Sequence, residues 1–335
     1  MPNDSSSTPE LYAASPGHQV SVLICILAVI VAEGCVTFAC ALCVCLTVAR
    51  HEALRSSKPF LLIAGQEFGD LCIGFANVVT GAQRMQRLLD GTAFDDTTRI
   101  SCAVEPFNML TWFYFGWQYF LMLNTISIDR LIMVSMPIWY YNKNKRYAHK
   151  MLGITYGCSL VVGVLALLDT LTSAEQQSYK LCTLSMTQTR ATSRLFTVYS
   201  NVLSLSSCVI YVLVVLLYVR SCSRTQPINN VLCNERPFLL SMGLTTMYTF
   251  LFACMPTLLY MAFVVWRGGI ESSEQQPSLA AAFALYCVLN MNVLLNGVTY
   301  LRRHRELRHG FAALLRRKLM PANLDLWTVQ AHGVM

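Results

Sequence analysis

The chain has 335 residues, of which 55% are hydrophobic and only 13% are charged. Soluble domains carry about 25% charged residues, so this composition excludes an ordinary soluble protein and indicates a membrane protein. The net charge of +7 does not favour a nucleic-acid partner, because the basic residues gather in segments between apolar runs.

Seven apolar runs are long enough to cross a membrane, which takes about 20 residues in a helix. They lack the alternation of barrel strands, so the expected fold is all-α, a bundle of seven transmembrane helices. We expect an outer tail at 1–19, the transmembrane domain at 20–300 and a cytoplasmic part at 301–335. The seven runs are Val20–Ala49, Phe60–Gln83, Phe107–Val134, Met151–Leu171, Leu195–Val219, Phe238–Trp266 and Ser278–Tyr300.

The basic residues predict the orientation of the chain. If the N-terminus lies outside the cell, the inner segments hold eighteen Lys and Arg residues and the outer segments hold seven. Positive segments stay in the cytoplasm, so we expect an outer N-terminus and a cytoplasmic C-terminus. No cationic segment precedes the first run, so no cleaved signal peptide is expected. Asn3 begins an Asn-Asp-Ser sequon in the outer tail and is a candidate glycosylation site.

Cysteine placement agrees with that orientation. Ten of the fourteen cysteines fall in apolar runs, and Cys222 and Cys233 lie in an inner loop. Only Cys102 and Cys182 face the oxidising side, so a disulfide between them is favoured over two free thiols.

Three acidic residues fall inside the first two runs. Glu33 is either a site residue or a buried structural acid. Glu67 and Asp70 are three residues apart and share one helix face, where two acids do not both ionise cheaply. For Glu67, a hydrogen bond to a neighbouring helix is preferred over a ligand role.

The third run ends in the charged pair Asp129-Arg130, followed by Pro137 and a basic loop. An Arg at mid-bilayer costs about 2.5 to 3.5 kcal/mol on insertion scales. A charge pair at this position therefore either anchors the helix end at the interface or has a function.

The last two runs contain a proline and several amides. Pro256 removes a backbone hydrogen bond and predicts a kink that could act as a hinge. Asn290, Asn292 and Asn296 lie in the seventh run, and unpaired buried amides cost about 1 to 3 kcal/mol. We expect Asn292 and Asn296 to form a polar network with Asp70.

After the seventh run, apolar residues recur at helical spacing among basic residues. This pattern predicts an amphipathic helix on the inner membrane surface, with membrane lipid as its partner. The apolar stripe consists of Leu307, Phe311, Leu314 and Leu315.

Taken in order, four motifs resemble those of the rhodopsin-like G-protein-coupled receptors. Ile128-Asp129-Arg130-Leu131 resembles the Asp-Arg-Tyr motif, with Leu131 in place of Tyr. Asn296-Gly297-Val298-Thr299-Tyr300 resembles Asn-Pro-x-x-Tyr, with Gly297 in place of Pro. The other two are Phe250, Cys254 and Pro256, at the helix-six Phe-x-x-x-Trp-x-Pro switch, and Glu306-Leu307-Arg308 to Phe311, at the opening of helix eight.

The chain departs from the family pattern at several landmarks and is similar to the nematode-type serpentine chemoreceptors. The resemblance implies that Asp129 holds Arg130 at rest and that Arg130 meets a heterotrimeric G protein when helix six swings at Pro256. Tyr300, with Tyr211 or Tyr218, would stabilise the open form. Arrestin is a further implied partner.

Asp70, Asn292 and Asn296 fall at the family's sodium pocket. Tyr119 replaces the serine of that pocket, so we expect a hydrogen-bonded network there. No cofactor or metal is expected.

The family's position for the amine-binding Asp aligns with Trp112. A cationic amine ligand is therefore disfavoured, because no carboxylate offsets the desolvation of an ammonium group. The expected pocket suits an apolar or weakly polar molecule or a short peptide, although each of its rings could equally serve packing. Its residues are Trp112, Phe113, Gly116, Thr257, Leu258, Tyr286 and Asn290.

The sequence bears on three classes of function. A ligand-activated receptor, acting as a chemoreceptor, fits the motifs. A transporter or proton-coupled carrier is the alternative, motivated by Glu33, Glu67, Asp70 and Asp169, but the halves of the chain show no internal repeat. An enzyme is not expected, since none of the six histidines lies in an apolar run.

Overall fold

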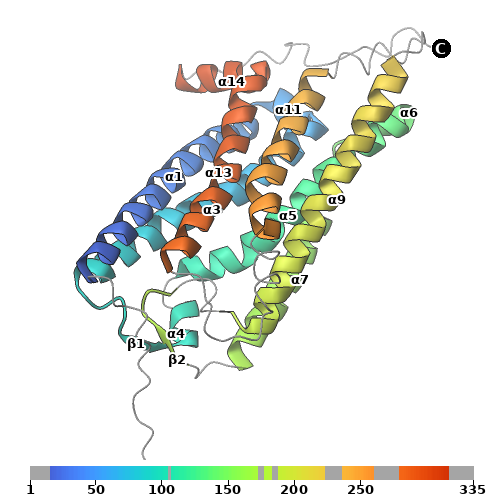
Figure 1. The fold of residues 1–335 in the computed structure, drawn as a ribbon. Coiled ribbons are helices and arrows are strands. Elements are labelled where there is room, and N and C mark those ends of the chain that lie inside the picture. Colours follow the sequence, from blue (N-terminus) through green and yellow to red (C-terminus); the bar gives the residue numbers. More distant parts are fainter. Residues whose placement is uncertain are drawn as a thin grey trace, which may run out of the picture.

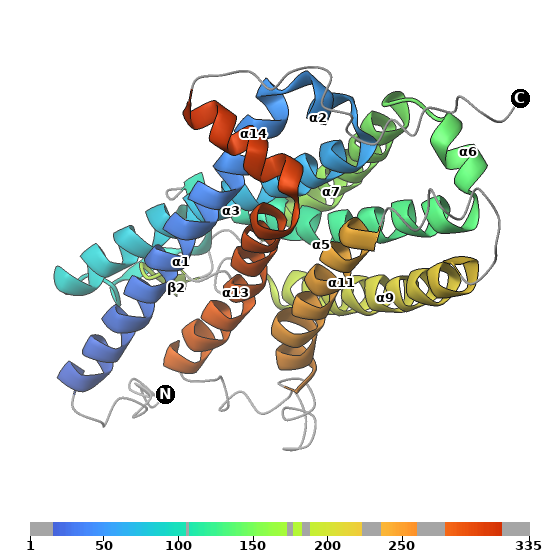
Figure 2. The ribbon, with the colours of Figure 1, turned by 90° about the horizontal axis from the view of Figure 1, so that it is seen from above.

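The computed structural model describes residues 16–104, 107–172, 177–182, 188–222, 236–259 and 279–316. Within these ranges the fold is nearly all helical, with eleven α-helices, one π-helix and one two-stranded sheet. The long helices run side by side along one bundle, as both views show (Figure 1, Figure 2). The sheet lies at one end of the bundle and the short helix α14 at the other (Figure 1).

The long elements match the predicted runs and extend several of them by a few residues. They are α1 (Pro16–Arg50), α3 (Lys58–Leu89), α5 (Phe107–Ser135), α7 (Arg146–Thr172), α9 (Arg190–Cys222), α11 (Arg236–Tyr248), η1 (Thr249–Cys254) and α13 (Leu279–Arg303). The short elements are α2 (Glu52–Ser56), β1 (Asp96–Thr98), α4 (Arg99–Val104), α6 (Pro137–Asn142), β2 (Gln177–Tyr179) and α14 (Arg305–Leu315).

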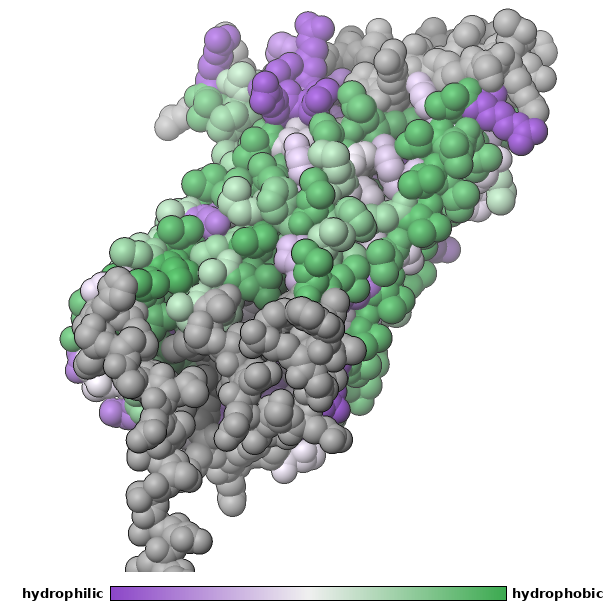
Figure 3. Space-filling view, viewed as in Figure 1, coloured by the Kyte–Doolittle hydropathy of each residue, from purple (hydrophilic) through white to green (hydrophobic). Residues whose placement is uncertain are grey.

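In the part of the chain that is described, five helices are long and apolar enough to cross a membrane: α1, α3, α7, α9 and α13. The helix α5 is not among the five, and it carries Gln118, Asn124 and the Asp129-Arg130 pair. The sixth predicted run is described only to residue 259, where Gly243–Leu259 forms a shorter apolar helix. Figure 3 shows hydrophobic residues over the flank of the bundle and hydrophilic residues at the α14 end.

Small residues bring α1 and α3 close together. A Cβ atom on Gly74 would lie 2.7 Å from the backbone nitrogen of Phe38, and one on Gly34 would lie 3.0 Å from the carbonyl oxygen of Gly74. Only glycine fits at such distances, and close backbone approach of this kind is common between membrane helices. The α1–α3 pair therefore forms a rigid side of the bundle.

The sheet end is closed by a covalent bond and by an arginine. Cys102 and Cys182 form the predicted disulfide, with an S–S distance of 2.04 Å. Strand β1 pairs antiparallel with β2, which the sequence analysis did not predict. Arg84 Nε donates to the carbonyl oxygen of Leu181 at 3.0 Å, and its Nη2 donates to that of Cys182 at 2.5 Å. The segment around Cys182 is thus bound to α3 as well as to α4.

At the opposite end, α14 packs against the bundle through part of its predicted apolar stripe. Leu307 is fully buried, whereas Leu315, the last residue of α14, is 70% exposed on the protein surface. The contact of the stripe with membrane lipid stays a prediction. His51 Nε2 forms a 3.0 Å hydrogen bond with the carbonyl group of Gly310, which ties α14 to the end of α1.

Candidate functional site

The charged pair at the end of α5 lies inside the protein. Asp129 and Arg130 are both 0% exposed, and Arg130 Nη2 lies 3.0 Å from Asp129 Oδ2. Tyr140 Oη donates to the same carboxylate oxygen at 3.2 Å, and Arg130 Nη1 lies 3.4 Å from Met133 Sδ. A guanidinium that only anchored a helix at the interface would reach toward water, whereas this one is buried. We call the connected side chains of Asp129, Arg130 and Tyr140 the latch.

The chain folds back on itself to complete this latch. Helix α5 ends at Ser135, and Pro137 opens α6, which suits the first turn of a helix because proline has no N–H to bond. The short helix returns Tyr140 to Asp129, and the Tyr140 ring is buried among Met133, Val134, Val214 and Leu239. The sequence analysis treated this segment as a basic loop and missed the helix.

Tyrosine side chains of the neighbouring helices pack near the latch. Tyr211 Oη, on α9, donates to the carbonyl oxygen of Leu239 on α11. Tyr300 is buried in a core cluster with Val44, Leu62 and Met122, while Tyr218 is only half-buried beside α11. The structure therefore shows one arrangement of these tyrosines, and their part in an open form stays a prediction.

A polar network crosses the middle of the bundle, with Tyr119 at its centre. Asn292 Nδ2 and Asn296 Nδ2 donate to Tyr119 Oη at 2.6 and 3.0 Å. Thr249, in η1, donates to Asn292 Oδ1 at 3.3 Å. The hydroxyl group of Tyr119 thus connects the two asparagines.

Asp70 binds a residue of its own helix. Its Oδ1 accepts a 3.2 Å hydrogen bond from Gln66 Nε2. Among the described residues no direct hydrogen bond joins Asp70 to Asn292 or Asn296, so the wider network with Asp70 stays a prediction. Tyr119, which the sequence suggested only as the replacement of a serine, binds both asparagines.

Glu67 lies deep in the bundle, fully buried, and neither of its carboxylate oxygens has a hydrogen-bond partner in the described ranges. The preferred expectation of a hydrogen bond to a neighbouring helix is therefore wrong. A Cβ atom on Gly297 would lie 3.3 Å from Glu67 Oε2. The glycine that replaces the family's proline thus leaves room for this side chain. Glu33, also buried, lies beside Asn290.

Three residues of the predicted ligand pocket come together around Asn77, which was not predicted. Trp112 Nε1 and Tyr286 Oη donate to Asn77 Oδ1 at 3.1 and 2.6 Å, and Asn77 Nδ2 donates to Asn290 Oδ1 at 3.2 Å. The rings of Trp112 and Tyr286 are 5.2 Å apart. Asn77 was missed because it stands alone in an apolar part of the second run.

Two other predicted pocket residues lie elsewhere. Phe113 is buried with Trp117 and Ala166 against α7. Leu258 is 37% exposed on the outside of the bundle. Both side chains lie apart from the Asn77 cluster, because spacing along a helix does not determine which neighbouring helix a side chain meets. Their part in ligand binding stays a prediction. Gly116 faces the Phe196 ring at 3.7 Å, measured from the position of an added Cβ atom.

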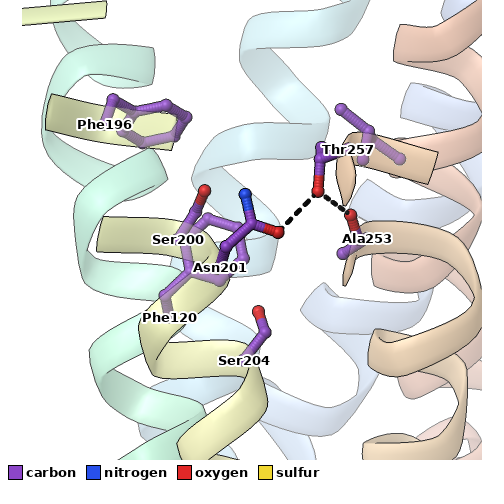
Figure 4. Close-up of a pocket in the computed structure, with 8 residues that line it drawn as sticks. Phe120, Phe196, Ser200, Asn201, Ser204, Ala253 and Thr257 are labelled. Atoms are coloured by element: carbon purple, nitrogen blue, oxygen red, sulfur yellow. Dashed lines mark hydrogen bonds between the residues drawn. The ribbon is translucent and has the colours of Figure 1, made fainter. Parts of the chain in front are cut away.

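A cavity of about 50 Å³ lies between α5, α9, the residues after α11, and α13. Thr257 Oγ1 donates to Asn201 Oδ1 at 2.8 Å across it (Figure 4). A water needs at least about 10 to 15 Å³ by this measure, so a larger ligand must widen the cavity. Its lining residues are Phe120, Phe196, Ser200, Asn201, Ser204, Ala253, Thr257 and Leu289, of which the sequence predicted only Thr257.

The helix that carries Thr257 is irregular just below the cavity. Residues Thr249–Cys254 form the π-helix η1, and Pro256 follows within two residues. Proline cannot donate the backbone bond of a regular helix, and π segments are frequent at functional sites. The predicted hinge region is therefore locally unwound.

Comparison with known proteins places the chain in a family. No curated protein matches it significantly. The family model described as "7 transmembrane receptor (rhodopsin family)" matches residues 40–300, which include the latch, the Tyr119 network and the cavity. The predicted glycosylation site Asn3 lies outside the described residues. Because the family model matches most of the 335 residues, the chain belongs to the rhodopsin family of seven-transmembrane receptors, which are multi-pass proteins of the plasma membrane.

Proposed function

We propose that the protein binds an extracellular ligand and activates a heterotrimeric G protein, as a chemoreceptor. The observation that carries this proposal is the buried Asp129–Arg130 pair, closed by Tyr140 at one end of the bundle. Breaking a buried ion pair leaves each charge without compensation, so the Arg130 guanidinium group would need a new partner once it left Asp129. A G protein that supplies acceptors for Arg130 would favour the open form.

The proposed architecture has seven spans. The helices α5 and α11–η1 join the five long apolar helices, and α14 lies on the inner membrane surface against lipid. Residues 1–19 form the outer tail, 20–300 the receptor domain and 301–335 the cytoplasmic part. Basic residues at the α14 end, such as Arg302 and Arg303, support the placement of this end in the cytoplasm.

The proposed ligand is a small molecule that is not a cationic amine, or a short peptide. None of the described residues that line the cavity is charged. Its hydroxyl and amide groups, between the rings of Phe120 and Phe196, suit a neutral, weakly polar group. Trp112, Tyr286 and Asn290 lie in the same half of α5 and α13 and would extend the site.

Signalling then requires only that ligand and G protein favour the same open state. A ligand that enters the cavity displaces Thr257 from Asn201 and moves the end of η1. The movement passes along α11 to Leu239, which Tyr211 holds at rest. Opening there exposes Arg130. Arrestin would bind the same open state, and no catalytic step is proposed.

The test is a screen of neutral small molecules and short peptides in cells that express a promiscuous G protein. We expect one of them to stimulate nucleotide exchange with the wild-type protein and not with Arg130→Ala at equal surface expression. Arg303→Ala, at an exposed arginine of the same end, is the matched control and should behave as wild type.

The alternative of a carrier makes the opposite prediction. It rests on the buried acids Glu33, Glu67 and Asp70. Protein that reaches the cell surface, never supports exchange across these panels, and moves solute into vesicles would overturn the proposal.

A further inference from the structure

Lys58, the first residue of α3, contacts the helix α6 that completes the latch. Its Nζ donates to the carbonyl oxygens of Tyr140 and Lys143, the latter at 3.0 Å. Lys143 is the C-cap residue of α6. The last carbonyl groups of a helix lack most of their partners within the helix, and of these two only that of Tyr140 also accepts a backbone N–H from a described residue, Lys143, at 3.2 Å. The Lys58 ammonium group thus caps α6 from another element.

The charge of Lys58 suits α6 and does not suit its own helix. A cation at the N-terminus of a helix opposes the helix dipole, whereas a cation at a C-terminus stabilises it. Lys58 stands at the N-terminus of α3 and at the C-terminus of α6. The favourable interaction is therefore the one across to α6.

The same ammonium group also contacts the tyrosine of the latch. Lys58 Nζ lies 4.0 Å from the centroid of the Tyr140 ring, within the range of a cation–π interaction. The hydroxyl group of that ring donates to Asp129, which pairs with Arg130. The Lys58 charge also acts electrostatically on the Asp129 carboxylate. Two contacts thus connect Lys58 to the ion pair, one through the backbone of α6 and one through the Tyr140 ring.

We propose that Lys58 is a positioning residue that holds Tyr140 against Asp129 and so suppresses ligand-independent signalling. Without its charge the end of α6 loses its cap, Tyr140 leaves the carboxylate, and Arg130 is released more often. This inference rests on the proposed G-protein function for its signalling consequence, but not for its structural part.

The signalling test compares ligand-independent nucleotide exchange per surface receptor. Lys58→Met keeps the aliphatic stem and removes the charge together with both hydrogen bonds of Nζ. A net loss of the size of one typical hydrogen bond already predicts a rise of about threefold to tenfold. Tyr140→Phe removes only the hydroxyl group and should give a similar rise. Lys145→Met, at an exposed lysine close by, should give none.

The combination of variants separates positioning from general stabilisation. Since Lys58 acts through Tyr140, the double variant should signal no more than the stronger single variant. Lys58→Arg keeps the charge, so its ligand-independent nucleotide exchange per receptor should stay near the wild-type level. A lysine that merely stabilised the fold would lower surface expression without raising exchange per receptor, and that result would overturn the proposal, as would additive rises.

A second measurement does not need a G protein. Amide hydrogen exchange of the purified full-length protein should be faster in the segment 137–143 of Lys58→Met than in the wild type or Lys145→Met. Equal exchange would overturn the proposal whatever the signalling result. If no variant and no wild-type sample acts on any G protein while this segment exchanges faster in Lys58→Met, the proposed function fails and the role of Lys58 stands.

Discussion

The two ends of the bundle are closed by different chemistry. At the α14 end, a buried ion pair, a tyrosine and a lysine form one connected set. At the sheet end, a disulfide and the bonds of Arg84 to backbone carbonyls fix the chain, and neutral groups surround a small cavity. A buried ion pair is either formed or broken, since a single buried charge without its partner is costly. Neutral bonds of about 0.6 kcal/mol each in a membrane can rearrange one at a time around a ligand.

The largest effect is expected from a variant that removes the disulfide at the sheet end. Cys102→Ser removes a disulfide that closes 80 residues of chain, which corresponds to about 4 kcal/mol in the chain-entropy account. We expect loss of surface expression and a lower melting temperature of the purified protein. Cys158→Ser, at a free exposed cysteine, is the control and should leave both unchanged. Equal behaviour of the two variants would mean that Arg84 and the helices suffice to close this end.

A smaller effect tests the α14 end through pH. His304, between α13 and α14, is buried against Phe60 and Tyr300, and burial, with the nearby charge of Arg130, lowers its pKa to about 4. Its usual pKa of 6.5 applies in the unfolded chain, so the unfolded state binds more protons between pH 6.5 and 4. Stability is therefore complete above pH 6.5 and falls as the pH is lowered, by about 1.4 kcal/mol per pKa unit of difference between the two states.

The measurement is the melting temperature at pH 7.5 and 5.5. The wild type should lose about 1 kcal/mol more of its stability on acidification than His304→Phe, which cannot take up the proton. His309→Asn, at an exposed histidine of α14, should lose as much as the wild type. An equal loss in all three proteins would show that other groups determine the pH dependence.

The smallest effect concerns the cavity. Asn201→Ala removes the one acceptor of the Thr257 hydroxyl group that lies on another helix, while the Ala253 and Cys254 carbonyl groups stay within reach, and it should lower stability by no more than about 0.6 kcal/mol. Ser204→Ala, on the same wall, should have almost no effect, because the Ser204 hydroxyl group has no hydrogen-bond partner in the described ranges. Melting temperatures of the two variants make the comparison, and a greater loss for Ser204→Ala would contradict the assignment of the cross-helix bond.

The sequence predicted the long helices and the disulfide for simple reasons. A span needs an apolar run of a fixed length, and only two cysteines were left on the oxidising side. The helix α3 runs past its predicted end at Gln83 to Leu89, because carbonyl groups from a distant segment accept the hydrogen bonds of Arg84. No local pattern contains that information.

The polar sites were harder to predict than the spans. Asp70 was expected to join a network with Asn292 and Asn296, whereas Tyr119 is the side chain that binds both of them. Ser200, Asn201 and Ser204 were not singled out from the sequence, although they line the cavity. The neighbour of a polar side chain depends on how the helices are rotated against one another, which hydropathy does not encode.

The π-helix before Pro256 changes the angular relation between the two parts of its helix. A single additional residue in a helix turns everything beyond it by about 100°. If η1 rewound into regular geometry, the part of the helix that carries Thr257 would turn relative to the part that carries Leu239. The side chains beside the cavity and those beside Tyr211 could then not both keep their present neighbours.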